Sequence, residues 1–147
     1  MSKNKINVAV IGATGYTGLD LVFLLSKHPK IKIKYLCATK NLGRNISFFD
    51  KRIKKKFPKI SSIEDIKWNT IDLVFLSLPN GEAQKIINKT YDKFKKVKFI
   101  DLSADFRIAD PKVYKKNYKL NHKSKKNQKN SIYAISEFVK EDICKFR

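Results

Sequence analysis

The sequence predicts an α/β protein with a doubly wound parallel sheet and helices on both faces. Three observations support this prediction. Apolar segments of strand length alternate along the chain with amphipathic segments of helix length. Residues 71–78 form a nearly continuous apolar run, as strands that are buried on both faces do. A glycine-rich turn lies between the first predicted strand and the first predicted helix, where folds of this class build a ligand site.

The N-terminal part predicts a strand, a helix and a second strand. Residues 5–11 are mostly apolar and form the first strand. A helix begins near residue 17 and ends at Lys27, because Pro29 lacks the N–H that would continue it. Apolar and basic residues alternate over residues 31–38, which indicates the second strand.

The middle part predicts a basic loop in front of the buried strand. Residues 39–59 are polar and very basic, so we expect a connection with short pieces of structure. A helical turn starts within residues 61–65. The buried strand at residues 71–78 leads into a turn at residues 79–81. The next helix covers residues 82–94, and its acidic first residue suits the positive end of the helix dipole.

The C-terminal part predicts a strand, a long loop and a last strand with its helix. The first of these strands covers residues 96–101. Residues 114–130 are basic and polar, which predicts an exposed loop. Residues 131–135 are predicted to form one more strand. Ser136 is a candidate N-cap for a helix over residues 137–144.

The glycine-rich turn predicts a pyrophosphate site in a Rossmann-type domain. Its three glycines are spaced three residues apart. Glycine adopts the backbone angles of such a turn and leaves room for a phosphate, and the helix N-terminus offers free N–H donors. The alternative is a sharp turn that binds nothing. The predicted cofactor-binding residues of this turn are Gly12, Ala13, Thr14, Gly15, Tyr16, Thr17 and Gly18.

Other predicted cofactor residues lie at the same edge of the sheet, because the carboxyl ends of parallel strands meet there. Domains that prefer NAD place an acid at the end of the second strand, but this chain has Thr39 and Lys40. A hydroxyl and a cation suit a 2′-phosphate, so we predict NADP(H) as cofactor. The alternative is that Lys40 is one more solvated lysine. After the buried strand, the residues predicted to border the nicotinamide are Leu78, Pro79 and Asn80, unless they form a plain turn.

The loop after the strand at residues 96–101 carries the candidate substrate-binding residues Ser103, Asp105 and Arg107. Arg107 and the acids Asp101 and Asp105 could instead form an ion pair that fixes the loop, which is the more common role for such groups. Ser103 could donate to a phosphate or cap a turn. The sequence leaves these alternatives open.

The composition excludes several classes of function. The chain has 147 residues and is 42% hydrophobic, so we expect one domain, residues 1–147, with a substantial core. No apolar run suits a membrane span or a signal peptide, which predicts a cytoplasmic protein without a membrane partner. The net charge is +20, but only four of the 33 basic residues are arginine. Because nucleic-acid readers favour arginine, we expect no nucleic-acid partner and only a general attraction for anionic ligands. A basic nucleic-acid binder is the rival hypothesis.

The two cysteines and two histidines do not predict a metal site. Cys37 lies in an apolar strand and is predicted to be a small core residue. Cys144 lies near the end of the last predicted helix, and neither cysteine has CxxC spacing. His28 and His122 stand beside proline or lysine and are both predicted to be solvated.

Several segments resemble a known enzyme family. Residues 99–107 read Phe-Ile-Asp-Leu-Ser-Ala-Asp-Phe-Arg, and residues 110–114 read Asp-Pro-Lys-Val-Tyr. With the glycine turn and residues 74–81, they closely resemble the N-acetyl-γ-glutamyl-phosphate reductases of arginine biosynthesis over essentially the whole chain. That family usually has histidine where this chain has Asn80. The glycine turn is also similar to that of aspartate-semialdehyde dehydrogenases.

The resemblance implies an oxidoreductase that uses NADPH to reduce an acyl phosphate to an aldehyde. In the family a cysteine thiolate attacks the acyl phosphate, hydride reduces the thioester, and a histidine assists as acid and base. The nucleophile lies in an Asn-Pro-Gly-Cys-Tyr-Pro segment beyond a Gly-Leu-Pro-Glu segment. Residues 134–137 correspond to the second of these in altered form, and the cysteine segment is absent. Cys144 is therefore not assigned as nucleophile, and no catalytic residue is predicted.

We therefore expect the NADP(H)-binding domain of such a reductase, inactive by itself on N-acetyl-glutamyl phosphate. We expect it to form a homo-oligomer only through a domain that this sequence lacks. The alternatives are an aspartate-semialdehyde-type reductase domain and a non-catalytic NADP-binding regulatory module.

Overall fold

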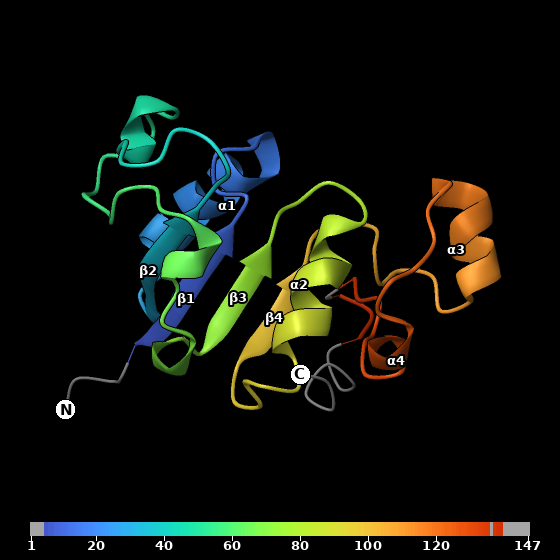
Figure 1. Ribbon diagram of the computed structural model, residues 1–147. Coiled ribbons are helices and arrows are strands. Elements are labelled where there is room, and N and C mark those ends of the chain that lie inside the picture. Colours follow the sequence, from blue (N-terminus) through green and yellow to red (C-terminus); the bar gives the residue numbers. More distant parts are fainter. Residues whose placement is uncertain (1–4, 136, 140–147) are drawn as a thin grey trace.

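The computed structural model describes residues 5–135 and 137–139 and contains a four-stranded parallel sheet (Figure 1). The strand order is β2-β1-β3-β4, and every neighbouring pair is parallel. This order confirms the predicted doubly wound α/β class, since the chain moves outward from β1 first to one side and then to the other. The strands are β1 (Ile6–Ile11), β2 (Ile31–Cys37), β3 (Leu73–Leu76) and β4 (Lys98–Asp101).

Helices cover both faces of the sheet, and alternate residues of β1 show this directly. Val8 and Val10 pack in one apolar cluster with Val22 of helix α1 (Tyr16–Lys27). Ala9 and Ile11 lie in a second cluster that includes Ala83 and Ile87 of helix α2 (Glu82–Thr90). Because successive strand residues point to opposite faces, the two clusters lie on opposite sides of the sheet. The predicted two-sided core is confirmed.

The N-terminal elements follow the predicted pattern closely. β1, α1 and β2 begin and end within one residue of their expected bounds. Helix α1 ends at Lys27, where the N–H of His28 still bonds the carbonyl of Leu25 and Pro29 follows. In the connection after β2, a short 3-10 helix covers Ile46–Phe48 and another covers Ile63–Asp65. The second of these has a capping box with Ser62, so the predicted helical turn is confirmed.

β4 begins at Lys98, two residues later than predicted, and two other elements are shortened by more. The strand predicted over residues 71–78 is reduced to β3, because Ile71 closes a 3-10 turn through its bond to the carbonyl of Trp68. The helix predicted over residues 82–94 ends at Thr90, after which Lys93 and Phe94 bond back to the Thr90 carbonyl as a turn. Apolar residues continue beyond both elements because the turns also pack against the core, and hydrophobicity alone does not mark their ends.

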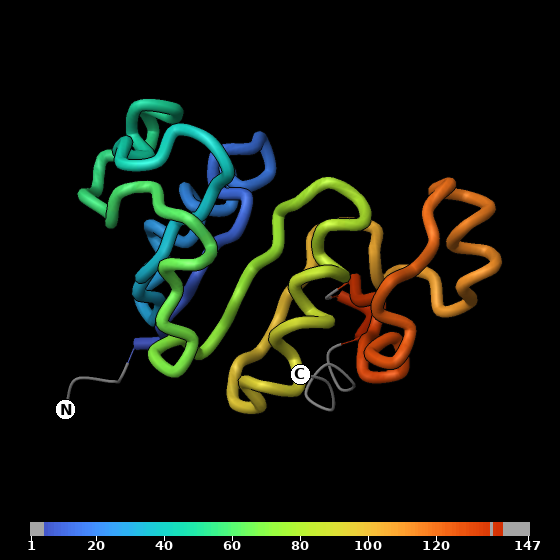
Figure 2. The backbone as a smooth tube through the Cα atoms, in the orientation of Figure 1, coloured from blue at the N-terminus to red at the C-terminus, as the bar shows by residue number. Residues whose placement is uncertain are grey.

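The prediction of an exposed loop over residues 114–130 is wrong. Helix α3 (Pro111–Tyr118) begins at the N-cap Asp110, whose carboxylate accepts the N–H of Lys112. A single-turn helix α4 (Lys125–Gln128) follows. An N-cap acid followed by proline is a helix start signal, and the lysine-rich composition obscured it. Figure 2 traces the chain outward through α3 and back to α4. There Lys126 of α4 forms an ion pair of 2.7 Å with Asp92, which follows the end of α2.

The strand predicted at residues 131–135 is also absent: these residues carry no regular secondary structure. Ser136, as well as residues 140–144 of the last predicted helix with Cys144, lie outside the described residues. Within residues 5–135 and 137–139, no helix has the length and apolar character needed to cross a bilayer.

Candidate functional site

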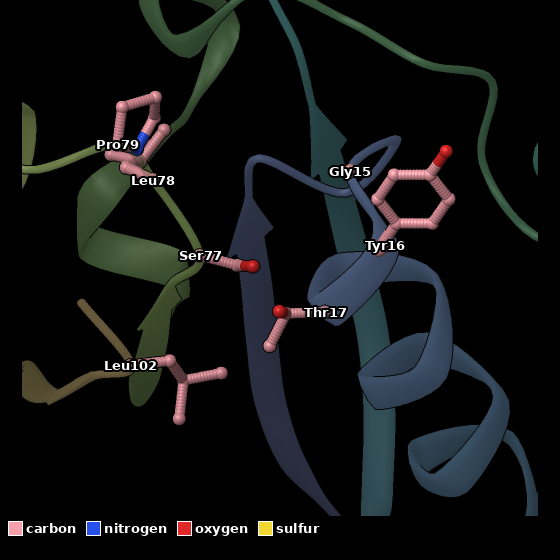
Figure 3. A pocket seen from close by; sticks show the side chains of 7 residues that line it. All are labelled: Gly15, Tyr16, Thr17, Ser77, Leu78, Pro79 and Leu102. Atoms are coloured by element: carbon pink, nitrogen blue, oxygen red, sulfur yellow. The ribbon is translucent and has the colours of Figure 1, made fainter.

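A cavity of about 220 Å³ opens at the carboxyl edge of the sheet, between the glycine turn and the ends of β3 and β4 (Figure 3). Five of its lining residues are predicted cofactor residues, and two are not. In Figure 3 the side chains of Thr17 and Ser77 face each other across it, while the Tyr16 ring points away. The cavity is lined by Gly15, Tyr16, Thr17, Ser77, Leu78, Pro79 and Leu102. Ser77 lies near the end of the strand predicted over residues 71–78, and Leu102, which was not predicted as a site residue, directly follows the strand predicted over residues 96–101.

Two of the three glycines are required by close packing. Gly12 has φ of +86°, and a Cβ there would lie 1.9 Å from the carbonyl oxygen of Ser77. A Cβ on Gly18 would lie 2.1 Å from the carbonyl oxygen of Gly12. Gly15 differs, since its nearest neighbour would be 3.5 Å from a Cβ and the residue borders the cavity. The outer glycines therefore shape the turn, and the central one leaves open space beside it.

The N-terminus of α1 faces this open space without a protein cap. Gly15 is the N-cap and supplies no side chain, and the first turn contains no acid. Within the described part of the chain, the N–H groups of Tyr16, Thr17 and Gly18 have no hydrogen-bond acceptor. Unpaired donors at the positive end of a 12-residue helix form a site that suits an anion such as phosphate.

The predicted 2′-phosphate residues lie on a loop at the end of β2. Thr39 and Lys40 are both exposed. The loop is closed behind them by two backbone hydrogen bonds, from Gly43 to Ile60 at 2.7 Å and from Ile60 to Arg44 at 2.9 Å. No acid occupies residues 38–44, so the polar groups that the loop presents to a ligand are a hydroxyl, an amide and cations.

The loops after β3 and β4 are joined by hydrogen bonds. The Ala104 N–H donates to the Asn80 side chain at 3.4 Å, and the Gly81 N–H donates to the Asp105 carboxylate at 2.7 Å. Gly81 has φ of +91° and is the N-cap of α2. Residues 79–81 and 102–107 thus form one continuous wall beside the cavity.

The candidate substrate residues have different environments in this wall. Ser103 is buried, and its hydroxyl donates to Asp101 at 2.9 Å and accepts the N–H of Asp105 at 3.1 Å. Asp105 is fully buried, so both residues are engaged inside the protein, which does not fit direct contact with a ligand. Arg107 is exposed, and its Nε donates to the Ser103 carbonyl at 3.0 Å. Among the described residues Arg107 forms no ion pair, so the predicted acid–arginine pair is replaced by bonds to backbone.

Asp101 lies at the end of β4, and its ionisation is disfavoured. Burial raises the pKa of the Asp101 carboxyl above its usual value. The backbone N–H and hydroxyl of Ser103 act in the opposite direction and offset the rise only in part.

The prediction that both histidines are solvated is wrong for His122. This ring is 5% exposed, and its Nε2 lies 2.8 Å from the Asp105 carbonyl oxygen. Its Nδ1 accepts the N–H of Ser124 at 3.2 Å, which requires a neutral ring with the proton on Nε2. His28 is exposed, as predicted. The neighbouring lysines misled the prediction for His122, because their own side chains point to solvent while the ring turns inward.

Cys37 is the buried core residue that the sequence predicts, with an exposed fraction of 1%. Burial raises the pKa of its thiol to about 11. A thiol that stays protonated at neutral pH and faces the core does not act as a nucleophile.

The fold and this site define a class: a Rossmann-type domain that binds a nicotinamide dinucleotide. A family model described as the semialdehyde dehydrogenase NAD-binding domain matches residues 7–146. The chain belongs to this family.

Two sequence relatives carry the same name. The chain is 44% identical over 143 residues to the N-acetyl-gamma-glutamyl-phosphate reductase of Ehrlichia canis, covering 96% of this chain and 40% of that protein. It is 38% identical to the reductase of the same name from Rhodospirillum rubrum, covering 97% of this chain and 42% of that protein. The chain thus spans about two fifths of the length of these curated relatives.

Solved structures agree on the fold. The aspartate semialdehyde dehydrogenase from Candida albicans, solved with NADP, matches with a TM-score of 0.55 and 21% identity, covering 71% of this chain and 31% of that one. An aspartate semialdehyde dehydrogenase II from Vibrio cholerae matches with a TM-score of 0.58, the same identity, and 71% and 30% coverage. At this identity the likeness concerns the fold.

Proposed function

We propose that this chain binds NADP(H) and forms the cofactor domain, residues 1–147, of an N-acetyl-γ-glutamyl-phosphate reductase. The observation that carries the proposal is the uncapped N-terminus of α1, which offers free N–H groups beside the open space at Gly15. A pyrophosphate fits such a site by charge and by hydrogen bonding. The named sequence relatives favour this reductase over an aspartate-semialdehyde enzyme.

Each part of the cofactor has residues that suit it. Thr39 and Lys40 would hold the 2′-phosphate by a hydroxyl donor and a point charge. Residues 12–18 would hold the pyrophosphate, and Leu78, Pro79 and Asn80 would border the nicotinamide ring. The bound cofactor would supply the hydride. The protein would orient the ring and limit access of water to it.

On the substrate side, Arg107 is the candidate that remains accessible. Its guanidinium is exposed and held by the carbonyls of Ser103 at 3.0 Å and Leu102 at 3.4 Å. We propose that its free donors attract the acyl phosphate in the full-length enzyme. Because no nucleophile is assigned among the described residues, we expect the 147-residue chain alone to bind cofactor without turnover.

The test is a titration of the purified chain with NADPH and with NADH, followed by nicotinamide fluorescence. We expect NADPH to bind at least about tenfold more tightly, since one added charge contact contributes roughly that factor. Lys40→Ala should remove the preference by weakening NADPH alone. The matched control is Lys112→Ala, which removes an exposed lysine on α3. Equal affinity for the two nucleotides in the wild-type chain would contradict the NADP(H) assignment.

An aspartate-semialdehyde-type domain and a non-catalytic NADP-binding module predict the same titration. The full-length protein separates them from the reductase. Phosphate-dependent oxidation of N-acetyl-glutamate semialdehyde with NADP⁺ supports the reductase. The same reaction with aspartate semialdehyde supports the first alternative, and no turnover with either aldehyde supports the second.

A further inference from the structure

We infer that Asp105 is a positioning residue for the nicotinamide side of the site, because its buried carboxylate caps helix α2 and fixes the turn in front of it. This inference rests on the proposed binding of NADP(H). It assigns Asp105 to holding the wall of the cavity, in place of direct contact with substrate, one of the alternatives that the sequence leaves open.

The cap is supplied from another part of the chain. Helix α2 has Gly81 as its N-cap, and glycine has no side chain to bond the first turn. Asp105 takes this role across 24 residues: one carboxylate oxygen accepts the Gly81 N–H at 2.7 Å, and the other accepts the Gln84 N–H at 3.2 Å. An acid at a helix N-terminus is stabilised by both hydrogen bonds and the helix dipole.

A buried polar network holds the carboxylate in place. The Tyr114 hydroxyl donates to Asp105 at 2.8 Å and accepts from the Gln84 side-chain amide at 2.9 Å. The side-chain carbonyl of Gln84 in turn accepts a hydrogen bond from the backbone N–H of Lys123. His122 bonds the Asp105 carbonyl oxygen and packs edge-on against the Tyr114 ring at 5.1 Å. Helix α3 and the segment before α4 thereby brace the loop after β4.

The turn that Asp105 caps borders the cavity. Leu78 and Pro79, which line it, precede Gly81 by three and two residues, so a fixed Gly81 limits how far they can move. The Asn80 side chain accepts the Ala104 N–H, which joins the same turn to the Asp105 loop a second time. Leu102 of that loop lines the cavity as well. None of these residues lies near Lys40, which is at the end of β2 on the far side of β1.

Because Asp105 supports only the nicotinamide side of the site, the two halves of the cofactor should respond differently to its loss. This difference separates a positioning role from general support of the fold. Loss of the Asp105 cap should loosen the nicotinamide side and leave the 2′-phosphate side intact. A purely structural role would weaken binding of the whole ligand and of its adenosine half in parallel.

The experiment compares the 147-residue chain with its Asp105→Asn variant. An amide keeps the size of the carboxylate but replaces one acceptor oxygen by a donor, so it bonds Gly81 or Gln84 but not both. NADPH affinity is measured by nicotinamide fluorescence, and affinity for adenosine 2′,5′-bisphosphate by displacement of NADPH. We expect the variant to bind NADPH about tenfold more weakly, with a lower fluorescence gain per bound molecule, and the half-ligand within about twofold of wild type.

The control is Asp110→Asn, which changes a helix N-cap acid of α3 that is exposed and does not contact the α2 turn. It should leave both affinities within about twofold of wild type. Unchanged NADPH binding in a folded Asp105→Asn chain, or equal weakening for both ligands, overturns the inference. A wild-type chain that binds neither ligand overturns the proposed function itself.

If Asp105→Asn does not fold, the same two affinities measured on Tyr114→Phe test the positioning role. It removes one hydroxyl that supports the carboxylate and leaves the two helix-capping bonds possible. We expect about threefold weaker NADPH binding with the half-ligand unaffected. Wild-type affinity for NADPH in a folded Tyr114→Phe chain contradicts the positioning role.

Discussion

The two walls of the candidate site are built in opposite ways. The glycine turn, residues 12–18, depends on side chains being absent: Gly12 and Gly18 leave no space for a Cβ, and the donors it presents are backbone N–H groups. The wall formed by residues 79–81 and 102–107 depends on side chains being present, above all the buried Asp105 and Ser103. One wall is shaped by steric exclusion and the other by hydrogen bonds.

The difference shows what each wall tolerates. A steric constraint against backbone has no alternative arrangement, so a single added methyl group disrupts the turn. A hydrogen-bond network loses one contact at a time, but each buried group left without a partner carries its own penalty. Substitutions in the glycine turn should therefore lower the free energy of unfolding either strongly or very little. Substitutions in the second wall should lower it in proportion to the number of hydrogen bonds lost.

The largest effect is expected for Gly12→Ala. Its φ of +86° is unfavourable for alanine, and the new Cβ would meet the Ser77 carbonyl oxygen at 1.9 Å. We expect the free energy of unfolding to fall by about 2–5 kcal/mol, from backbone strain and overpacking together. Urea unfolding followed by circular dichroism measures this. A loss below about 1 kcal/mol would show that the turn adapts, and the steric account would be wrong.

An intermediate effect is expected for His122→Phe. An aromatic ring is kept, but the Asp105 carbonyl and the Ser124 N–H lose their partner in a buried site. We expect a loss of about 1–3 kcal/mol in the free energy of unfolding.

His28→Phe is the matched control, since that ring is exposed and should change stability by less than about 0.5 kcal/mol. Equal effects at the two histidines would remove the distinction between a buried hydrogen-bonded ring and a solvated one.

A smaller stability effect, with a large effect on binding, is expected for Gly15→Ala. The nearest atom would lie 3.5 Å from the added Cβ, so the turn can accept it. Alanine is a poorer N-cap than glycine, which costs about 0.5–1 kcal/mol. The methyl group would occupy the open space beside the α1 N-terminus, so we expect at least about tenfold weaker NADPH binding by fluorescence titration. Unchanged affinity would place the pyrophosphate elsewhere.

The smallest effect is a pH dependence from Asp101, the β4 residue whose carboxylate bonds Ser103 of the second wall. Burial raises the pKa of Asp101, so the folded protein binds a proton more readily there than the unfolded chain does. The stabilising contribution of the protonated form is complete below the usual value of 3.8 and is lost as pH rises through the folded pKa.

Asp101→Asn has no titrating carboxyl, so it should not lose stability as pH rises from 3.8 through the folded pKa of Asp101. The free energy of unfolding of the variant minus that of wild type should therefore rise over this pH range and stay level above it. Thermal unfolding at a series of pH values measures the difference. If this stability difference instead falls as pH rises, the pKa of Asp101 is lowered by folding and the prediction is wrong.

The sequence by itself determined the N-terminal half and the edge of the sheet at which the candidate site is proposed. Strand, glycine turn, helix and strand are encoded by local periodicity and by residues with special backbone properties, such as Gly12 and Pro29. The burial of Cys37 followed from its apolar neighbours in β2. What the sequence did not contain is the reason that Gly12 is needed, since the Ser77 carbonyl approaches from 65 residues away.

Only the tertiary structure decided the second wall. Asp105 could have paired with Arg107, contacted a ligand or capped a helix, and a carboxylate in the sequence does not distinguish these. Its partners Gly81, Gln84 and Tyr114 come from a turn and two helices that meet only when the sheet and its connections are assembled. The burial of His122 was missed for the same reason. The helix at Pro111–Tyr118 differs, because its start signal is local and was obscured by the lysine-rich composition. Local propensity is visible residue by residue, whereas the pairing of a buried polar group is a property of the packed fold.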